Sequence, residues 1–198
     1  MGPAQRWVVL IAVILACAID IVYVSQIIGP PGGRPDPLVW RSPFVAFFIA
    51  LMAIAAAVAV RPLTVGWRTL LLGVSTVGLV AMGYLGIFSI GLPLLVAGLG
   101  LLIVLIGAVA ASRQPAGVLR AAAGGLLALV IFFGGLELTA RAISCPASGF
   151  EGGTGSSFFG GAYHYLCVDG KLTIRPGDCN HMGASIDPSG HVTAVSDC

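Results

Sequence analysis

The chain has 198 residues, of which 58% are hydrophobic and only 9% are charged, and its mean hydropathy is +1.01. Soluble domains carry about 25% charged and about 45–50% apolar residues, so this composition excludes an ordinary soluble protein. The formal net charge of +2 is too small to favour nucleic acid as a partner. The sequence therefore predicts an integral membrane protein in contact with membrane lipid.

Charge and cysteine content divide the chain near residue 144. Residues 1–143 hold eight Arg against three acidic residues, a balance of +5, whereas residues 144–198 hold two basic against five acidic residues, a balance of −3. Four of the five cysteines also lie in the second part. We therefore expect a transmembrane domain at residues 1–143 and a separate module at residues 144–198.

Five stretches of the first part are long and apolar enough to cross a bilayer, which takes about 20 residues for about 30 Å of hydrocarbon. The run between Arg68 and Arg113 holds no charged residue, and as a single helix it would be about 66 Å long. This run must turn back, and the turn is predicted at 86–93, where Gly and Pro cluster. The expected spans are residues 7–28, 43–60, 69–86, 91–111 and 120–143.

The arginines and cysteines together predict the orientation. With the N-terminus inside, five arginines lie at cytoplasmic ends of the spans and three at outer ends, as the positive-inside rule favours. Four cysteines in a small module indicate disulfides and an oxidising compartment. We expect a plasma-membrane protein with its N-terminus inside and its C-terminal module outside. Nine Arg to one Lys, with abundant Ala, Gly and Val, is typical of a GC-rich bacterial genome.

The first span has some features of a cleaved signal. Its Ala16-Cys17-Ala18 sequence resembles a cleavage site, and residues 14–17 loosely resemble a lipobox, which leaves lipidation at Cys17 open. The apolar run nevertheless continues to Ile28, whereas the apolar core of a signal has about 7–15 residues. We therefore expect a retained helix in which Cys17 packs as a membrane thiol.

Two acidic residues are expected inside the spans. A rise of about 1.5 Å per residue places Asp20 about 20 Å and Glu137 about 25 Å above the inner face. A carboxylate at membrane depth costs about 2.5 kcal/mol or more. One interpretation is a protonatable pair in a small transporter or channel subunit. The interpretation that we favour pairs Glu137 with Arg141 one helical turn later and lets Asp20 bond to a neighbouring helix or a tyrosine.

Glycine recurs along the third, fourth and fifth expected spans. Small residues let helix backbones approach closely in lipid, where dispersion and weak hydrogen bonds hold helices together. The spacing predicts a tightly packed bundle and singles out neither a dimer face nor a pore.

The outer module is expected to begin with a flexible linker at residues 148–161, where six of the fourteen residues are Gly. A β-hairpin is predicted from residues 163–168 and 171–175. These two runs flank Asp169-Gly170, a pair that favours a type I′ turn. The module is therefore expected to be a small β-structure that follows a five-helix, all-α membrane bundle.

A second hairpin is predicted around residues 187–190, Asp-Pro-Ser-Gly, between strands at 184–186 and 191–195. A two-residue loop there would make the numbers of paired residues sum to 377. Cys179 and Cys198 would then lie opposite each other, or within one residue of this if Gly190 forms a bulge, so a disulfide is expected between them.

The other two cysteines of the module, Cys145 and Cys167, are then expected to bond to each other and to tie the last helix to the first hairpin. A metal site is the alternative interpretation, and its ligands would be His164, Cys167, Cys179 and His181. These residues match no common zinc spacing, and disulfides compete for the cysteines outside the cytoplasm. We expect two disulfides, no metal and no other cofactor.

The sequence contains no motif for nucleotide binding, serine hydrolysis or zinc-dependent hydrolysis. The cytoplasmic loops, of about ten residues or fewer, are too short for a catalytic domain. We therefore expect a non-enzymatic accessory protein or subunit of a cell-envelope complex, whose outer module binds a partner protein. The alternative is a small transporter or channel subunit that uses Asp20 and Glu137.

Overall fold

A computed structural model describes residues 1–28, 40–88, 90–112, 115–147, 149–177, 183–186 and 192–196. The chain divides into two compact units, and each is described here by itself. The first unit comprises Met1–Pro35 and Pro43–Gly134, and the second comprises Asp36–Ser42 and Gly135–Cys198.

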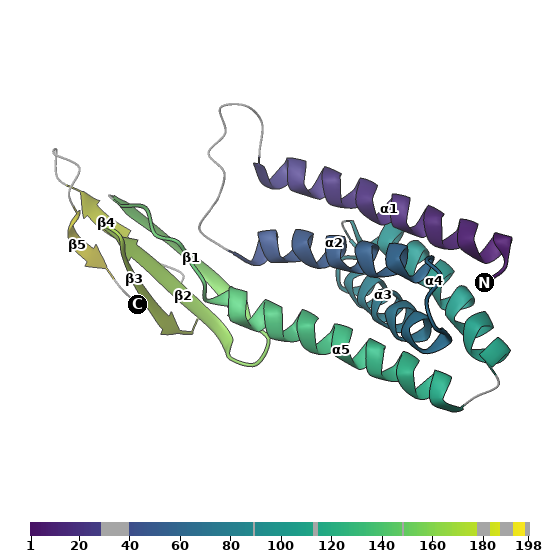
Figure 1. The fold of residues 1–198 in the computed structure, drawn as a ribbon. Coiled ribbons are helices and arrows are strands. Elements are labelled where there is room, and N and C mark those ends of the chain that lie inside the picture. The colour runs from purple at the N-terminus through teal and green to yellow at the C-terminus, as the bar shows by residue number, and fades with distance from the viewer. Residues whose placement is uncertain are drawn as a thin grey trace. The chain divides into compact units, whose positions relative to one another are not determined.

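In the described part of the chain, five long helices precede the first strand, and they overlap the five expected spans (Figure 1). They are α1 (Pro3–Ile28), α2 (Arg41–Ala59), α3 (Val65–Leu85), α4 (Gly91–Ser112) and α5 (Pro115–Ala140). All five are long and apolar enough to cross a membrane. A helix satisfies its backbone hydrogen bonds within one segment, as a lipid-exposed span requires. The chain thus has the helices of a multi-pass membrane protein.

The long uncharged run turns back between α3 and α4, where the glycines predicted a turn. Gly86 follows the last residue of α3, and its N–H donates to the carbonyl oxygen of Met82. The N–H of Gly91, at the start of α4, donates to the carbonyl oxygen of Gly86 at 2.7 Å. These two hydrogen bonds close the end of one helix onto the start of the next.

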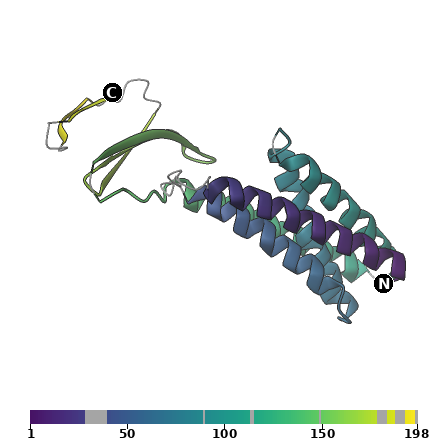
Figure 2. The same cartoon turned by 90° about the horizontal axis from the view of Figure 1, so that it is seen from above.

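Helix α3 is the most enclosed of the five helices. It packs along α4, and α4 in turn packs against α1 (Figures 1 and 2). The side chains of Leu72 and Leu79 in α3 are buried, as is that of Phe48 in α2. Phe48 also stacks at a tilt on Phe132 of α5, with the ring centroids 4.9 Å apart. The core of the first unit therefore lies around α3.

Glycines bring α3 close to its neighbours, as the sequence predicts. A Cβ atom on Gly73 would collide with the backbone oxygen of Ala121 in α5, and one on Gly124 of α5 would collide with that of Leu70 in α3. On the side of α4, a Cβ atom on Gly83 would lie only 2.6 Å from a backbone nitrogen. Real Cβ atoms do not approach other atoms so closely, so these contacts require glycine.

We expect Gly124→Ala to lower the free energy of unfolding in detergent by about 1–3 kcal/mol, because the added methyl group must displace the backbone at Leu70. Gly134→Ala is the matched control: it adds the same group to the same helix, where nothing lies within 4 Å. Ala favours a helix over Gly by about 1 kcal/mol, so the control should retain or gain stability. Thermal unfolding followed by circular dichroism measures both, and equal losses would contradict the close packing of α3 and α5.

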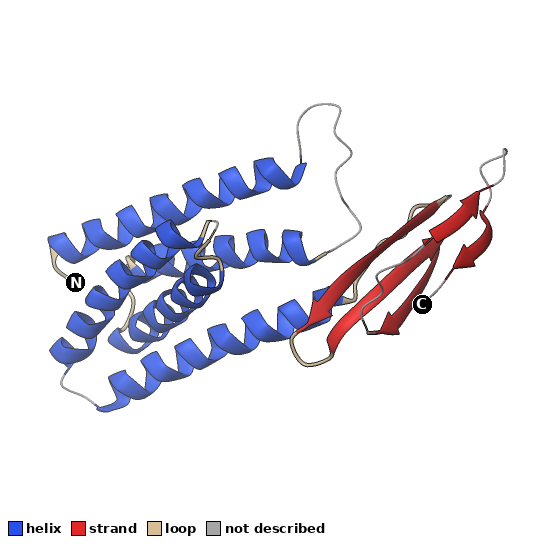
Figure 3. Ribbon diagram, turned by 180° about the vertical axis from the view of Figure 1, so that it is seen from behind, coloured by secondary structure: helices blue, strands red, loops and turns tan. Residues whose placement is uncertain are grey.

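The second unit contains a three-stranded antiparallel sheet, and strands are red in Figure 3. Its strand order is β1-β2-β3. The strands are β1 (Phe150–Ser157), β2 (Gly161–Val168) and β3 (Lys171–Pro176). Two further strands, β4 (Gly183–Ile186) and β5 (Val192–Ser196), form a separate antiparallel pair.

The hairpin predicted around Asp169-Gly170 is confirmed. Val168 pairs with Lys171, so the loop between β2 and β3 has two residues. Asp169 has a φ of +47° and Gly170 a φ of +79°. A type I′ turn needs positive φ at both loop residues, and Asp-Gly supplies this conformation at low cost.

The prediction of a flexible linker at residues 148–161 is wrong, because most of this segment forms β1. Two of the three glycines of β1 lie opposite aromatic residues of β2: Gly153 pairs with Tyr165 and Gly155 pairs with Tyr163. A Cβ atom on Gly153 would lie 2.7 Å from the hydroxyl oxygen of Tyr165. The tyrosine rings thus cover the glycines and supply the cross-strand packing that glycine lacks.

The second predicted hairpin is present as β4 and β5, but its predicted register is wrong. Ser185 pairs with Ala194, so the numbers of these paired residues sum to 379 and not to 377. The pairing shifts by one residue after Ser185, and Ile186 pairs with Val192. A longer connection and a bulge-like irregularity therefore replace the two-residue loop, and either change moves the register.

Candidate functional site

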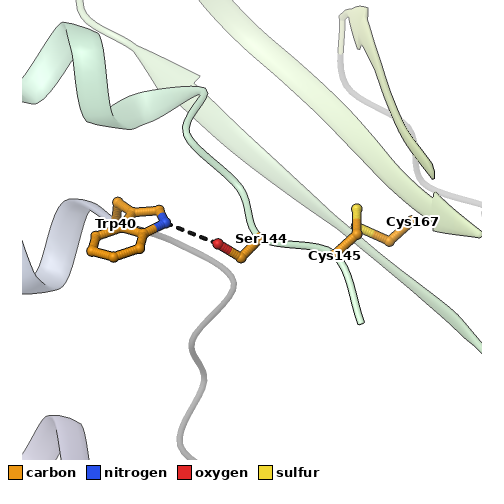
Figure 4. Close-up of a disulfide and its surroundings, with 4 residues drawn as sticks. All are labelled: Trp40, Ser144, Cys145 and Cys167. Atoms are coloured by element: carbon orange, nitrogen blue, oxygen red, sulfur yellow. Dashed lines mark hydrogen bonds between the residues drawn. A yellow bond between two sulfur atoms is a disulfide. The ribbon is translucent and has the colours of Figure 1, made fainter. Parts of the chain in front are cut away.

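A disulfide joins Cys145 and Cys167, as predicted (Figure 4). Their Cα atoms are 5.4 Å apart, and the bond ties the segment after α5 to β2. Cys167 is fully buried in a small core with Tyr163 and Tyr165. Because its sulfur is bonded to another cysteine, the alternative metal site that used Cys167 as a ligand is wrong.

The second predicted disulfide involves Cys179 and Cys198, which lie outside the described residues. The register that first suggested this bond differs from the register of β4 and β5. The prediction now depends on elimination alone. With Cys145 bonded to Cys167, the other two cysteines of the module are left for each other.

Tyr163 joins the sheet to the end of α5. Its hydroxyl group donates a hydrogen bond to the carbonyl oxygen of Ala140, the last residue of the helix, and both residues are buried. The last four carbonyls of a helix have no partner within the helix, and leaving a buried one unpaired costs about 1–3 kcal/mol. Tyr163 therefore caps the helix and packs in the core of the sheet.

The segment that enters α2 is bonded to the segment that leaves α5. The indole Nε1 of Trp40 donates to Oγ of Ser144 at 2.9 Å (Figure 4), and the backbone N–H of Trp40 donates to the carbonyl oxygen of Ala142 at 3.2 Å. The guanidinium group of Arg41 donates to the carbonyl oxygen of Ser156 in β1 at 2.6 Å. Segments more than a hundred residues apart are thus held together beside the disulfide.

Glu137 and Arg141 both contact the turn between β1 and β2. Oε2 of Glu137 accepts a hydrogen bond from the backbone N–H of Phe159 at 3.3 Å. A Cβ atom on Gly160 would collide with the guanidinium group of Arg141. Among the described residues, each of the two charged groups contacts this turn and the expected ion pair between them is not formed.

Asp20 lies in α1 and belongs to the first unit, whereas Glu137 belongs to the second. Within the described part of the chain, Oδ1 of Asp20 is buried and has no hydrogen-bond partner. The expected bond from Asp20 to a neighbouring helix or a tyrosine is therefore not formed at this oxygen. The interpretation of Asp20 and Glu137 as a protonatable pair stays a prediction.

A cavity of about 260 Å³ lies beside the cap of α5. Its lining residues are Arg141, Gly160, Ala162, Tyr163, Ile174 and Pro176. This lining combines one cationic group with an aromatic and aliphatic wall, and the hydroxyl group of Tyr163 in it is bonded to the carbonyl oxygen of Ala140. A guanidinium group next to apolar side chains is suited to binding a carboxylate-bearing group.

The sequence reasoning did not identify Trp40, Phe159 or Tyr163 as site residues. The position of Trp40 just before an apolar span was an available signal, because tryptophan is enriched at membrane interfaces. Nothing in the sequence indicates that Tyr163 caps α5 or that Phe159 bonds to Glu137, since both contacts depend on how the sheet meets the helix.

No protein-family model, curated protein or solved structure matches this chain. Its function is therefore inferred from the contacts of its own residues.

Peptide mapping without reduction, on protein from native membranes, should recover Cys145 linked to Cys167 and Cys179 linked to Cys198. The first bond spans 22 residues, and in the chain-entropy model replacing both cysteines by serine should destabilise the second unit by about 3 kcal/mol. Cys17→Ser is the control, because this cysteine is free and should not affect the module. Recovery of Cys167 linked to Cys179, or of four free thiols, would contradict the assignment.

Proposed function

We propose that this chain is a non-enzymatic, multi-pass protein of the bacterial plasma membrane. Its C-terminal module would lie outside the cytoplasm and bind a partner protein, as an accessory or subunit of a cell-envelope complex. The observation that carries the proposal is the attachment of the module to the ends of α2 and α5. A disulfide and several hydrogen bonds hold it there. A surface held in one position binds with a smaller loss of conformational entropy.

Two features support the orientation with the module outside. A structural disulfide forms and persists in an oxidising compartment, which the cytoplasm is not. Trp7 and Trp67 lie near the N-terminal ends of α1 and α3, and their side chains are 66% and 63% exposed. Exposed tryptophans at helix ends are typical of a membrane interface, and Arg6 and Arg68 beside them fit the cytoplasmic side.

The edge strands of the described sheet support a protein as the partner. β1 and β3 are the two edge strands, and Arg41 already occupies a carbonyl oxygen of β1. On β3, Lys171, Thr173 and Arg175 are exposed. An exposed edge strand is a template for a strand of another protein, and the basic side chains on β3 favour an acidic one.

Affinity purification from native membranes in mild detergent should return a partner protein with the wild-type chain. Thr173→Asp should reduce its recovery several-fold, because an aspartate on the edge strand opposes pairing with an acidic segment. The matched control is Thr154→Asp, the same substitution at an exposed position of β1, the other edge strand. Recovery of the chain alone, or equal losses in the two variants, would contradict the proposal.

A transporter or channel subunit is the second candidate function, and the unpaired buried oxygen of Asp20 favours it. A carboxyl oxygen that is buried without a hydrogen bond in a membrane helix is expensive, and acids at such positions are often functional. For an accessory protein we expect proton flux into liposomes to stay at the level of empty vesicles. Flux that is lost in Asp20→Asn but retained in Glu151→Gln, an exposed acid on β1, would support the transporter instead.

A further inference from the structure

The turn between β1 and β2 carries two exposed phenylalanines. The side chain of Phe158 is 65% exposed and that of Phe159 is 75% exposed. Their rings pack edge-to-face, with centroids 5.1 Å apart. Two adjacent exposed aromatic rings are unfavourable in water, so this turn is suited to an apolar or interfacial environment.

Two contacts hold the turn against the last turns of α5. The N–H of Phe159 donates to Oε2 of Glu137, and Gly160 lies against the guanidinium group of Arg141. Glu137 is three residues before Ala140, where α5 ends, so it lies about 4–5 Å before the end of the helix. The turn therefore lies alongside the apolar helix and not beyond it.

The large exposed apolar side chains of the second unit lie at the ends of α2 and α5 and in the turn between β1 and β2. Among its described residues, the large exposed hydrophobic side chains are Trp40, Leu138, Phe158 and Phe159. Trp40 precedes α2 by one residue, and Leu138 is in the last turn of α5 with 80% of its surface exposed. None of the four lies within a strand. Aromatic residues gathered at helix ends are typical of a membrane interface.

We propose that the turn between β1 and β2 is a lipid anchor whose two phenylalanines insert into the outer interface of the bilayer. The inference rests on the proposed function, because it requires α5 to span that membrane. Lipid is the occupant because the turn is bonded to a helix whose adjacent exposed side chain, Leu138, would itself face lipid. Arg141, exposed in the same region, can extend to the phosphate of a headgroup.

The anchor also explains how Glu137 is tolerated. A carboxylate near the outer end of a membrane helix needs donors to replace water. The inserted turn supplies such a donor, the backbone N–H of Phe159. Phe159 lies between β1 and β2, so its N–H is not used in the hydrogen bonds that pair the two strands. The hydrogen bond to Glu137 fixes the position of the turn along α5. The two phenylalanine side chains then keep the turn in contact with lipid.

Quenching of tryptophan fluorescence by brominated lipid tests the anchor in the full chain. The three native tryptophans are first replaced by phenylalanine, and Phe159→Trp then provides one emitter. The purified protein is reconstituted in phosphatidylcholine vesicles with or without bromine at shallow acyl positions. We expect about a twofold loss of emission for Phe159→Trp, as for an interfacial residue.

Two matched variants in the same background complete the test. Leu138→Trp reports the lipid-facing side of α5 and should be quenched to the same extent. Lys171→Trp puts the emitter on β3 opposite Val168, the last residue of β2, which is about 23 Å along the strand from Gly161, and this variant should not be quenched. A faster non-reducing gel mobility than after reduction would show that each variant retains its disulfide.

The outcomes separate the anchor from the proposed membrane location. If Leu138→Trp is quenched and Phe159→Trp is not, the lipid anchor is wrong and the membrane helix stands. If neither is quenched, the membrane position of α5 and the anchor both fail. Equal quenching at Lys171→Trp would also overturn the anchor, because lipid contact would then not be specific to this turn.

Discussion

A peptide group in hydrocarbon has no water to bond to, and this constraint governs both the helices and the way the chain leaves them. Within each span the helix satisfies the constraint by itself. The last carbonyl groups of α5 have no hydrogen-bond partner within the helix. The hydroxyl group of Tyr163 donates a hydrogen bond to one of them, the carbonyl oxygen of Ala140. Glu137 is a polar group that also needs a partner, and its Oε2 accepts a hydrogen bond from the backbone N–H of Phe159. The sheet therefore completes a hydrogen-bonding requirement that the helix creates.

Lipid also removes the usual reason for helices to associate, since an apolar side chain gains little by exchanging lipid for another helix. The first unit relies instead on close backbone approach around α3, where Gly73 faces α5 and Gly83 faces α4. These positions spread around one helix, which is why the glycine spacing in the sequence shows no single repeating ladder. A helix that packs on several sides needs small residues on several sides.

The sequence was sufficient for features that depend on local composition, and insufficient for those that depend on pairing. The five apolar runs, the turn at Gly86 and the Asp169-Gly170 hairpin each have a local physical cause, and all are present. β1 was mistaken for a linker because its glycines are weak strand formers alone and become acceptable only under Tyr163 and Tyr165. The register of β4 and β5 follows from the length of their connection, and a two-residue loop predicts a different register from the one observed.

The same distinction explains the charged residues of the site. Helical spacing put Glu137 and Arg141 one turn apart and so predicted an ion pair, which is the best partner that α5 alone offers. The sheet offers better placed groups: a backbone donor for the carboxylate, and the space beside Gly160 for the guanidinium group. The acid near the end of α5 thus marks the place where the turn between β1 and β2 contacts the last turn of this helix, a contact within the second unit that a one-dimensional periodicity cannot show.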